Sequence, residues 1–339
     1  MREFHAEQRA LADACWQLLC VREELPEPGT WLRRPVFGTD VFVQRSGDEL
    51  RAYENACAHR GFPIRTGDSG AGPIRCSFHG WTYNKDGVPT GIPRNAELFQ
   101  ISRDAQKTIG LRQVRLAELG RFVFATTSDK APPLEAFLGR HAQVYRVLDA
   151  RLAPLYAIRV LQSRASWRLH AEIALDDYHL ASIHPHSFGA EVAVDAYRYH
   201  YERDGLHSCL LRRRDPDWSF APFWAELAGG GFERTGYKMF NSFPGTTAGV
   251  TPNAAVVTSY LATGPRTTTA VVWSFLWPDA RDGLGTDVLG LNAQLFREDR
   301  EACEAWQTTV DALAHPPVLG VLEQRVRWFR ETYAAVVGA

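Results

Sequence analysis

Hydrophobic and polar positions in the first third of the chain predict one helix followed by several short strands. Residues 6–20 place Leu11, Cys15, Leu18 and Leu19 on one side of a helix, so they predict an N-terminal helix. Short β-branched or aromatic runs follow, at residues 36–37, 41–44, 50–53, 111–116 and 122–125. Such runs, separated by turns rich in Gly and Asp, predict a small antiparallel β domain.

A polar, proline-containing segment, residues 126–133 (T-T-S-D-K-A-P-P), separates this domain from the rest. We therefore divide the chain into residues 1–126 and 127–339. Beyond the boundary, we expect helices at residues 134–148, 166–183, 289–309 and 318–337, and strands at residues 160–167 and 238–277. Long strands in sequence indicate an antiparallel sheet, so the predicted fold class is α+β.

Length and charge narrow the functional classes. A chain of 339 residues suggests about two domains. The 38 basic and 39 acidic residues nearly cancel, which gives no indication of a nucleic-acid or anionic-membrane partner. No apolar stretch reaches 18 residues and the first residues contain no apolar signal region, so we expect a cytoplasmic protein without a membrane span.

Two short clusters of Cys and His carry the first candidate chemistry. Cys57-x-His59 and Cys76-x-x-His79 are separated by sixteen residues. A structural zinc site usually takes ligands of one kind from each cluster. Here each cluster supplies one thiolate and one imidazole, which suits a Rieske [2Fe–2S] centre, where two Cys bind one iron and two His bind the other.

The same stretch closely resembles the Rieske domain of ring-hydroxylating oxygenases. The loops of that family read C-x-H-R-G and C-x-x-H-G-W-x-Y, and both patterns occur between residues 57 and 83. The resemblance implies that Cys57, His59, Cys76 and His79 bind a [2Fe–2S] cluster. A structural zinc ion remains the alternative.

A second candidate site lies at His179 and His184. Residues five apart on a regular helix differ by about 140°, so the helix must bend or widen to aim both rings at one ion. Alone, this pair is weak evidence for a metal. A Rieske cluster, however, needs an electron acceptor, and a non-haem Fe(II) held by two His and one carboxylate leaves positions open for dioxygen.

The segment Asp176-Asp177-Tyr178-His179 with His184 resembles the D-x-Y-H-x-x-x-x-H motif of the catalytic domain of these oxygenases. The resemblance makes His179 and His184 iron ligands. It makes Asp176 the carboxylate that bridges an iron-ligand His and the Rieske His of a neighbouring subunit.

The third ligand has to come from elsewhere in the chain. Residues 296–307 resemble the E-D-x-x-x-x-E-x-x-Q stretch of the family, which implies Asp299 as this ligand. Glu298, Glu301 and Glu304 are its competitors, and a solvated helix face is the alternative reading of the charged run.

The resemblance covers nearly the whole chain, which looks like the α subunit of a Rieske non-haem iron oxygenase with a C-terminal catalytic domain of helix-grip type. It implies a homotrimer that uses O2, with electrons from NAD(P)H delivered by a flavin or iron–sulfur reductase or a ferredoxin. The chain length resembles that of members with an α subunit alone. We therefore expect hydroxylation or oxidative demethylation of a small organic substrate, with cis-dihydroxylation of an aromatic ring as the alternative.

Two readings from other functional classes also stay open. One is a Rieske electron carrier whose second domain only docks a partner, and the other is a zinc-stabilised binding module. The sequence does not name a substrate. Arg212, Arg213 and Arg214 could meet a substrate carboxylate, although a solvated loop is the simpler interpretation. Some aromatic residues are expected to line the pocket, with most of them in the core: Trp218, Phe220, Phe223, Trp224, Phe240, Phe243, Trp273 and Phe275.

Overall fold

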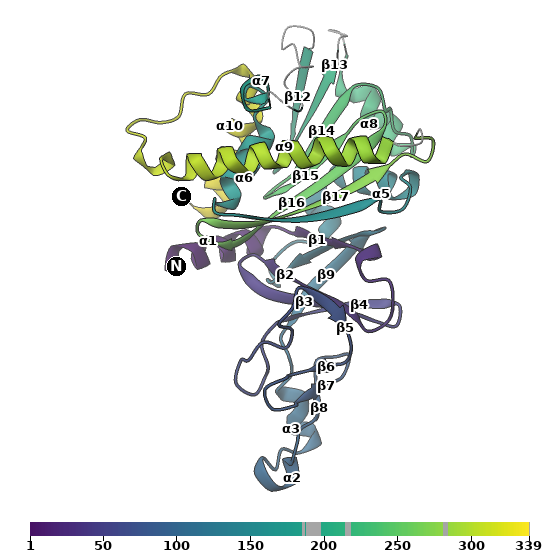
Figure 1. Ribbon diagram of the computed structural model, residues 1–339, viewed down its shortest axis with the longest axis vertical. Coiled ribbons are helices and arrows are strands. Elements are labelled where there is room, and N and C mark those ends of the chain that lie inside the picture. The colour runs from purple at the N-terminus through teal and green to yellow at the C-terminus, as the bar shows by residue number, and fades with distance from the viewer. Residues whose placement is uncertain (185–186, 188–197, 214–217, 281–283, 339) are drawn as a thin grey trace.

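The computed structural model describes residues 1–184, 187, 198–213, 218–280 and 284–338. Figure 1 shows a narrow lower part, built from the N-terminal third of the chain, and a broader upper part, where one long helix crosses the face of a sheet. Both main sheets are antiparallel, and helices cover the upper one. The predicted α+β class is confirmed.

The lower part contains a seven-stranded sheet in the order β1-β10-β9-β4-β3-β2-β5. Its strands are β1 Gln17–Val21, β2 Thr30–Val36, β3 Thr39–Ser46, β4 Glu49–Glu54, β5 Ser69–Ala71, β9 Gln113–Leu119 and β10 Phe122–Thr126. The strands predicted from the short apolar runs are confirmed, except that Phe37 lies in the turn after β2 and that β9 begins at Gln113. Gly38 and Gly47 turn the β2–β3 and β3–β4 hairpins with positive φ, which Gly adopts without steric cost.

The predicted helix over residues 6–20 is wrong in its second half. Helix α1 spans Arg2–Ala14, and the following apolar run forms strand β1, which pairs with β10. All five residues of β1 are buried. A continuous apolar run in a strand covered on both faces has no alternation, so its sequence can be mistaken for the end of a buried helix.

The tip of the lower part is a small three-stranded sheet with two short helices. It contains β6 Ile74–Arg75, β7 Thr82–Tyr83, β8 Pro89–Gly91, α2 Asn95–Leu98 and α3 Arg103–Thr108. A turn within residues 84–88 connects β7 and β8. Both Cys–His clusters lie in loops at this end of the molecule.

The upper part is built on a second seven-stranded sheet in the order β11-β17-β16-β15-β14-β13-β12. Its strands are β11 Ala157–Ser163, β12 Arg198–Asp204, β13 His207–Arg213, β14 Tyr237–Ser242, β15 Thr246–Val250, β16 Ala254–Gly264 and β17 Thr267–Leu276. The strands predicted over residues 238–277 are confirmed. Strands β12 and β13 were not predicted, because β12 in particular is rich in charged and polar residues.

The helices of the upper part are α4 Leu134–Leu138, α5 His141–Arg151, α6 Trp167–Leu175, α7 Leu180–Ile183, α8 Phe220–Ala228, α9 Leu284–Gln307 and α10 Gln324–Val337. Two predicted helices are interrupted. Gly139, at φ +53°, separates α4 from α5, and residues 176–179 separate α6 from α7. The strand predicted at residues 160–167 ends at Ser163, and Trp167 begins α6.

Alternating residues of the upper sheet face different layers. Phe240 of β14 packs on Phe223 of α8, with ring centroids 5.8 Å apart. Met239, the preceding residue, lines a cavity on the opposite face, which helices α6 and α9 cover. The aromatic residues of the core and the residues of the cavity therefore belong to different faces of the same strands.

A buried carboxylate joins the two sheets. Glu24 Oε1 accepts hydrogen bonds from the indole N–H of Trp273 in β17 (2.7 Å) and from the main-chain N–H of Val21 (3.0 Å). Arg34 Nη1 lies 3.0 Å from the same oxygen and also donates to the carbonyl of Leu19 at 2.7 Å. The side chains of Glu24 and Arg34 are less than a tenth exposed, so their charges are compensated inside the protein.

We expect Glu24→Gln to lower the free energy of unfolding by about 3–5 kcal/mol, because it leaves the buried Arg34 guanidinium without its counter-charge. Urea denaturation measures this loss. Glu23→Gln is the matched control: Glu23 pairs with Arg121 at 3.1 Å but is 31% exposed, so about 1 kcal/mol or less is expected. Equal losses for the two variants would contradict the role of Glu24.

Candidate metal centres

The two Cys–His loops of the tip share one backbone design. The main-chain N–H of Gly61 donates to the carbonyl of Cys57 (2.7 Å), and that of Gly80 donates to the carbonyl of Cys76 (3.0 Å). Both glycines have positive φ, +74° and +76°. A tight turn therefore follows each Cys, and each turn presents one thiol and one imidazole.

The thiols and the imidazoles of these loops lie at different depths. Cys57 and Cys76 are buried, whereas His59 is half-buried and His79 is exposed. The two imidazole rings are 4.8 Å apart, and Trp81 stacks on His59 with the rings 5.1 Å apart and nearly parallel. A binuclear cluster with its sulfur-bound iron inside and its nitrogen-bound iron outside fits this arrangement.

Tyr83 contacts one of the two buried thiols of this group. The hydroxyl of Tyr83 lies 3.0 Å from Cys57 Sγ and accepts the main-chain N–H of Ala58 at 3.1 Å. Burial raises the pKa of the Cys57 thiol, and the neighbouring Cys76 thiol acts in the same direction. Tyr83 ends the C-x-x-H-G-W-x-Y pattern, but sequence analysis gave it no chemical role. Hydrogen bonds to ligand sulfurs tune the potential of a cluster.

The donor geometry also bears on the zinc alternative. Among the residues that the structure describes, only His179, His184 and Asp299 bring three donor atoms within 4.8 Å of one another. The four side chains of the tip loops do not form such a group, and the pairing of one thiol with one imidazole in each loop favours a binuclear cluster over a tetrahedral zinc ion.

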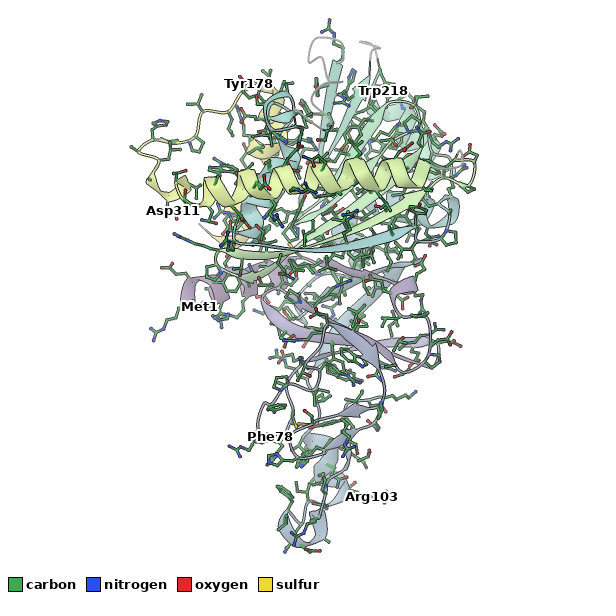
Figure 2. The ribbon with its side chains drawn as sticks, in the orientation of Figure 1. Met1, Phe78, Arg103, Tyr178, Trp218 and Asp311 are labelled. Carbon is green, nitrogen blue, oxygen red and sulfur yellow. The ribbon has the colours of Figure 1, made fainter. Side chains whose placement is uncertain are left out.

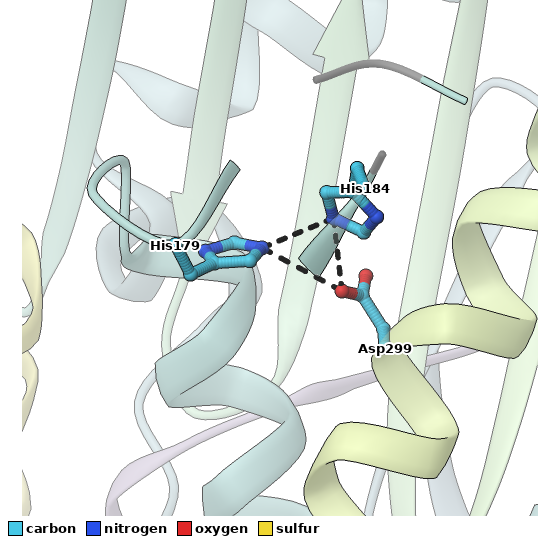
Figure 3. A group of neighbouring side chains, drawn as sticks. All are labelled: His179, His184 and Asp299. Carbon is cyan, nitrogen blue, oxygen red and sulfur yellow. Dashed lines mark hydrogen bonds and ion pairs between the residues drawn. The ribbon is translucent and has the colours of Figure 1, made fainter. Parts of the chain in front are cut away.

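His179, His184 and Asp299 form a compact group in the upper part (Figure 3). Their closest donor atoms are His179 Nε2 and His184 Nε2 at 3.1 Å, His184 Nε2 and Asp299 Oδ1 at 3.1 Å, and His179 Nε2 and Asp299 Oδ1 at 3.6 Å. Asp299 Oδ1 is buried without a hydrogen-bond donor. Two imidazoles and one carboxylate are the donor set of non-haem Fe(II), so the group fits that ion.

A break between two helices brings the two histidines together. Helix α6 ends at Leu175, His179 directly precedes α7, and His184 directly follows it. The predicted bend or widening of one helix is in fact an interruption, after which a four-residue helix carries a His at each end. The ring centroids are 5.0 Å apart.

Burial and neighbouring charges shift the pKa values of this group in opposite directions. Burial would lower the pKa of His184, but the carboxylates of Asp299 and Glu298 outweigh it and raise that pKa. Burial would likewise raise the pKa of Asp299, but His179 and His184 outweigh it and lower that pKa. The Asp299 carboxylate is therefore held in its ionised form, as a metal ligand requires, whereas each imidazole has to be neutral to bind a metal.

The competing carboxylates of α9 lie in other environments. Glu298 Oε2 accepts the Nδ1 proton of His184 (2.9 Å) and the hydroxyl of Ser187 (2.6 Å). Glu301 is exposed, and Glu304 accepts the main-chain N–H of Arg164. Glu298 therefore fixes the tautomer of His184 that directs Nε2 toward Asp299, a role that sequence analysis did not assign.

Asp176 makes a different contact from the one expected. The family resemblance implied that its carboxylate accepts a hydrogen bond from an iron-ligand His. Instead, His179 Nδ1 donates to the main-chain carbonyl of Asp176 at 2.8 Å, and the carboxylate Oδ2 lies 3.8 Å from that nitrogen. The carboxylate Oδ1 accepts the main-chain N–H groups of Tyr178 (2.7 Å) and His179 (3.3 Å).

A cavity of about 440 Å³ opens beside the three donors, between the sheet and helix α9. Helix α9 contributes Leu291, Leu295 and Phe296 to its wall, on the same helix face as Asp299. Such a volume and a largely apolar wall suit a small organic molecule.

Two expectations about the pocket are corrected. None of the eight aromatic residues named from the sequence is in the cavity wall that the structure describes, where Tyr237, Tyr260 and Phe296 supply the rings. Arg212 is not in a solvated loop, because it lies in β13, is buried and lines the cavity. The side chain of Arg213 and the whole of Arg214 lie outside the described residues.

Comparison with known families agrees with this architecture. The Rieske [2Fe-2S] domain family matches residues 15–105, which include all four Cys and His of the tip loops. The family described as ring hydroxylating alpha subunit (catalytic domain) matches residues 150–339, more than half of the chain. The chain belongs to the ring-hydroxylating alpha-subunit family. The predicted family, with a Rieske domain followed by a catalytic domain, is confirmed.

Individual members of the ring-hydroxylating alpha-subunit family show partial similarity. The carnitine monooxygenase oxygenase subunit of Acinetobacter pittii is 28% identical over 238 residues, 65% of this chain and 62% of that protein. The anthranilate 1,2-dioxygenase large subunit of Acinetobacter baylyi is 30% identical over 190 residues, 53% of this chain and 40% of that protein. The matched region thus spans less than two thirds of each of these relatives.

Solved structures show that the likeness extends over the whole fold of the chain. Naphthalene 1,2-dioxygenase from Rhodococcus sp. superposes with a TM-score of 0.78 at 19% identity, over 98% of this chain and 91% of that chain. A quaternary ammonium Rieske monooxygenase gives 0.76 at 21% identity, over 98% and 91%. The predicted combination of an antiparallel Rieske domain and a helix-grip catalytic domain is confirmed as the fold.

We expect Glu298→Ala to weaken divalent-metal binding at His179, His184 and Asp299 by about 10–100-fold, because His184 loses the acceptor that orients it. Anaerobic titration of the cluster-loaded protein with Fe(II) or Co(II) measures this affinity. Glu301→Ala, an exposed change on the same helix, should leave it unchanged. If both variants bind as tightly as the wild type, Glu298 does not position His184.

Proposed function

We propose that this chain is the terminal oxygenase component of a Rieske non-haem iron system. The observation that carries the proposal is the His179–His184–Asp299 group, open to a cavity, in a chain that also holds the Rieske loops. When bound, the mononuclear iron would activate O2 with electrons supplied by the [2Fe–2S] cluster. His179, His184 and Asp299 would hold this iron, and Cys57, His59, Cys76 and His79 the cluster.

For the reaction, we propose hydroxylation or oxidative demethylation of a small organic substrate. Relatives that act on methylated nitrogen compounds support this class, namely the carnitine monooxygenase oxygenase subunit and the N,N-dimethyl phenylurea N-demethylase subunit alpha of Sphingobium sp., the latter 31% identical over 194 residues. Ring cis-dihydroxylation is the second candidate, favoured by the anthranilate 1,2-dioxygenase relative. The largely apolar cavity would hold the substrate and keep water away.

The positions of the two centres favour electron transfer between subunits. Phe78, beside the cluster ligand His79, and Tyr178, beside the iron ligand His179, lie toward opposite ends of the molecule in Figure 2. Both are exposed, 52% and 69%. We propose a homotrimer in which Asp176 connects the iron site to the Rieske loops of the next copy. Inter-subunit electron transfer has been described for the quaternary ammonium Rieske monooxygenase of this fold.

The remaining partners follow from this function. We propose electron supply from NAD(P)H through a flavin or iron–sulfur reductase or a ferredoxin. No helix in the described part of the chain is long and apolar enough to cross a membrane. A cytoplasmic location and the division into residues 1–126 and 127–339 belong to the same proposal.

Purified protein is expected to contain three irons and two acid-labile sulfides per chain, with a Rieske EPR spectrum after reduction. Oxygen uptake would then be screened with methylated amines, aryl ethers and aromatic rings, each as a carboxylate and as its neutral amide because Arg212 lines the cavity. Two irons and two sulfides, unchanged after Fe(II) is added back, would leave an electron carrier. A diol product would favour the second candidate.

Asp176→Asn is expected to slow reoxidation of the reduced cluster during a single turnover by about 10–100-fold, while both iron sites stay loaded. Stopped-flow absorbance of the cluster, with iron analysis of the same sample, measures the effect. Asp311→Asn, a change at a largely exposed carboxylate of the same domain, is the control. Unchanged cluster reoxidation in Asp176→Asn would remove Asp176 from the electron path.

A further inference from the structure

Two consecutive carboxylates in the loop between α6 and α7 have different surroundings. Asp176 keeps about a fifth of its side chain exposed, and its Oδ1 is held by main-chain N–H groups of its own loop. The Asp177 side chain is 5% exposed, and its partners come from distant segments. The family motif D-x-Y-H leaves the position of Asp177 open, so the resemblance assigns no role to this residue.

One peptide unit links Asp177 to a candidate metal ligand. The N–H of Asp177 donates to the carbonyl of Leu322, with N and O 3.2 Å apart. The carbonyl of the same peptide unit, that of Asp176, accepts the Nδ1 proton of His179 at 2.8 Å. A peptide unit is planar, so the hydrogen bond to Leu322 helps to set the direction of the carbonyl that orients the His179 ring.

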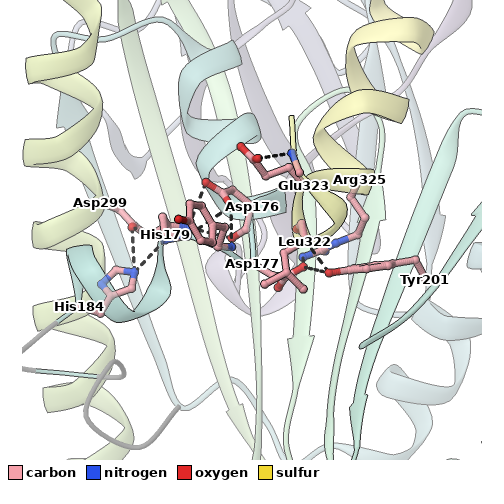
Figure 4. Close-up of polar contacts among 11 residues, drawn as sticks. Asp176, Asp177, His179, His184, Tyr201, Asp299, Leu322, Glu323 and Arg325 are labelled. Carbon is pink, nitrogen blue, oxygen red and sulfur yellow. Dashed lines mark hydrogen bonds and ion pairs between the residues drawn. The ribbon is translucent and has the colours of Figure 1, made fainter. Parts of the chain in front are cut away.

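The side chain of Asp177 also holds this peptide unit in place, through contacts with two other segments of the chain (Figure 4). Arg325 Nη2 lies 2.9 Å from Asp177 Oδ2, and the hydroxyl of Tyr201 donates to that oxygen at 3.1 Å. The Arg325 side chain is 1% exposed. A buried, doubly bonded carboxylate has few alternative positions, because every move would leave a charge without its partner.

We propose that Asp177 is a positioning residue, which Arg325 and Tyr201 hold so that the 176–177 peptide unit aims His179 Nε2 at the metal. Strand β12 and the segment that begins α10 thereby support the metal site without touching the metal. The proposal rests on the proposed function for the presence of a metal at His179, His184 and Asp299.

A second ion pair, one turn further along α10, provides a matched control. Arg330 of α10 donates to Glu172 of α6, with Nε and Oε2 3.0 Å apart, and the Glu172 side chain is 3% exposed. This pair connects α10 to α6, whereas the Arg325–Asp177 pair connects α10 to the loop that follows α6. The Arg330–Glu172 pair bonds neither the 176–177 peptide unit nor His179. Arg330→Met therefore reports on the loss of a helix-to-helix ion pair alone.

The test uses Co(II) titration of the full-length, cluster-loaded protein without substrate, with the ligand-field spectrum of the bound ion as a second readout. Asp177→Asn and Arg325→Met are expected to weaken Co(II) binding by about tenfold and to shift its bands, because His179 is no longer aimed. Tyr201→Phe removes one donor and keeps the ion pair, so it should fold and show a smaller change in the same direction. Arg325→Lys should recover part of the affinity.

The Arg330→Met control distinguishes an effect on the orientation of His179 from a general loss of stability. Arg330→Met should lower the melting temperature and leave Co(II) affinity and spectrum as in the wild type. The proposal is overturned if Tyr201→Phe and Arg325→Lys give the wild-type affinity and spectrum, or if Arg330→Met changes both as strongly as Arg325→Met. A wild-type protein that binds no Co(II) beside its cluster would instead overturn the proposed function, a result distinct from unchanged variants.

Discussion

Ionised carboxylates that leave water have to find cations or hydrogen-bond donors within the protein, and three of them determine how distant segments of this chain are joined. Glu24 connects the N-terminal sheet to Trp273 of the catalytic sheet. Asp177 connects the loop after α6 to Arg325. Asp299 lies against the two imidazoles. Each carboxylate is mostly buried, so each contact constrains its two segments far more than a surface ion pair would.

The two candidate centres are constructed in different ways. The Rieske loops are local, because each closes through a glycine four residues after its Cys and ends near the surface. The catalytic group is assembled from segments far apart in the chain and faces an interior cavity. This difference suits their proposed tasks, since a centre that exchanges electrons with partners has to be reachable and one that handles O2 benefits from exclusion of water.

The same contrast explains what the sequence could predict. The Cys–His loops were readable because their donors lie within a few residues of each other, and His179 and His184 because a family motif contains both. The family resemblance also implied Asp299, but only the fold shows that the adjacent Glu298 supports His184 instead of joining the metal ligands. The contact between Asp177 and Arg325 spans 148 positions, which no local pattern encodes. Strand β1 was mistaken for helix because burial on both faces removes the periodicity that distinguishes the two.

The shared face of helix α9 has an evolutionary consequence. Leu291, Leu295 and Phe296 line the cavity from the same rigid helix that carries Asp299. Side chains along one helix face can be exchanged without moving the backbone that holds the next one. Substitutions at these three positions can therefore reshape the cavity while the carboxylate stays in place. Selection for a new substrate can act on this helix without rebuilding the metal site, which helps one architecture to diversify into many activities.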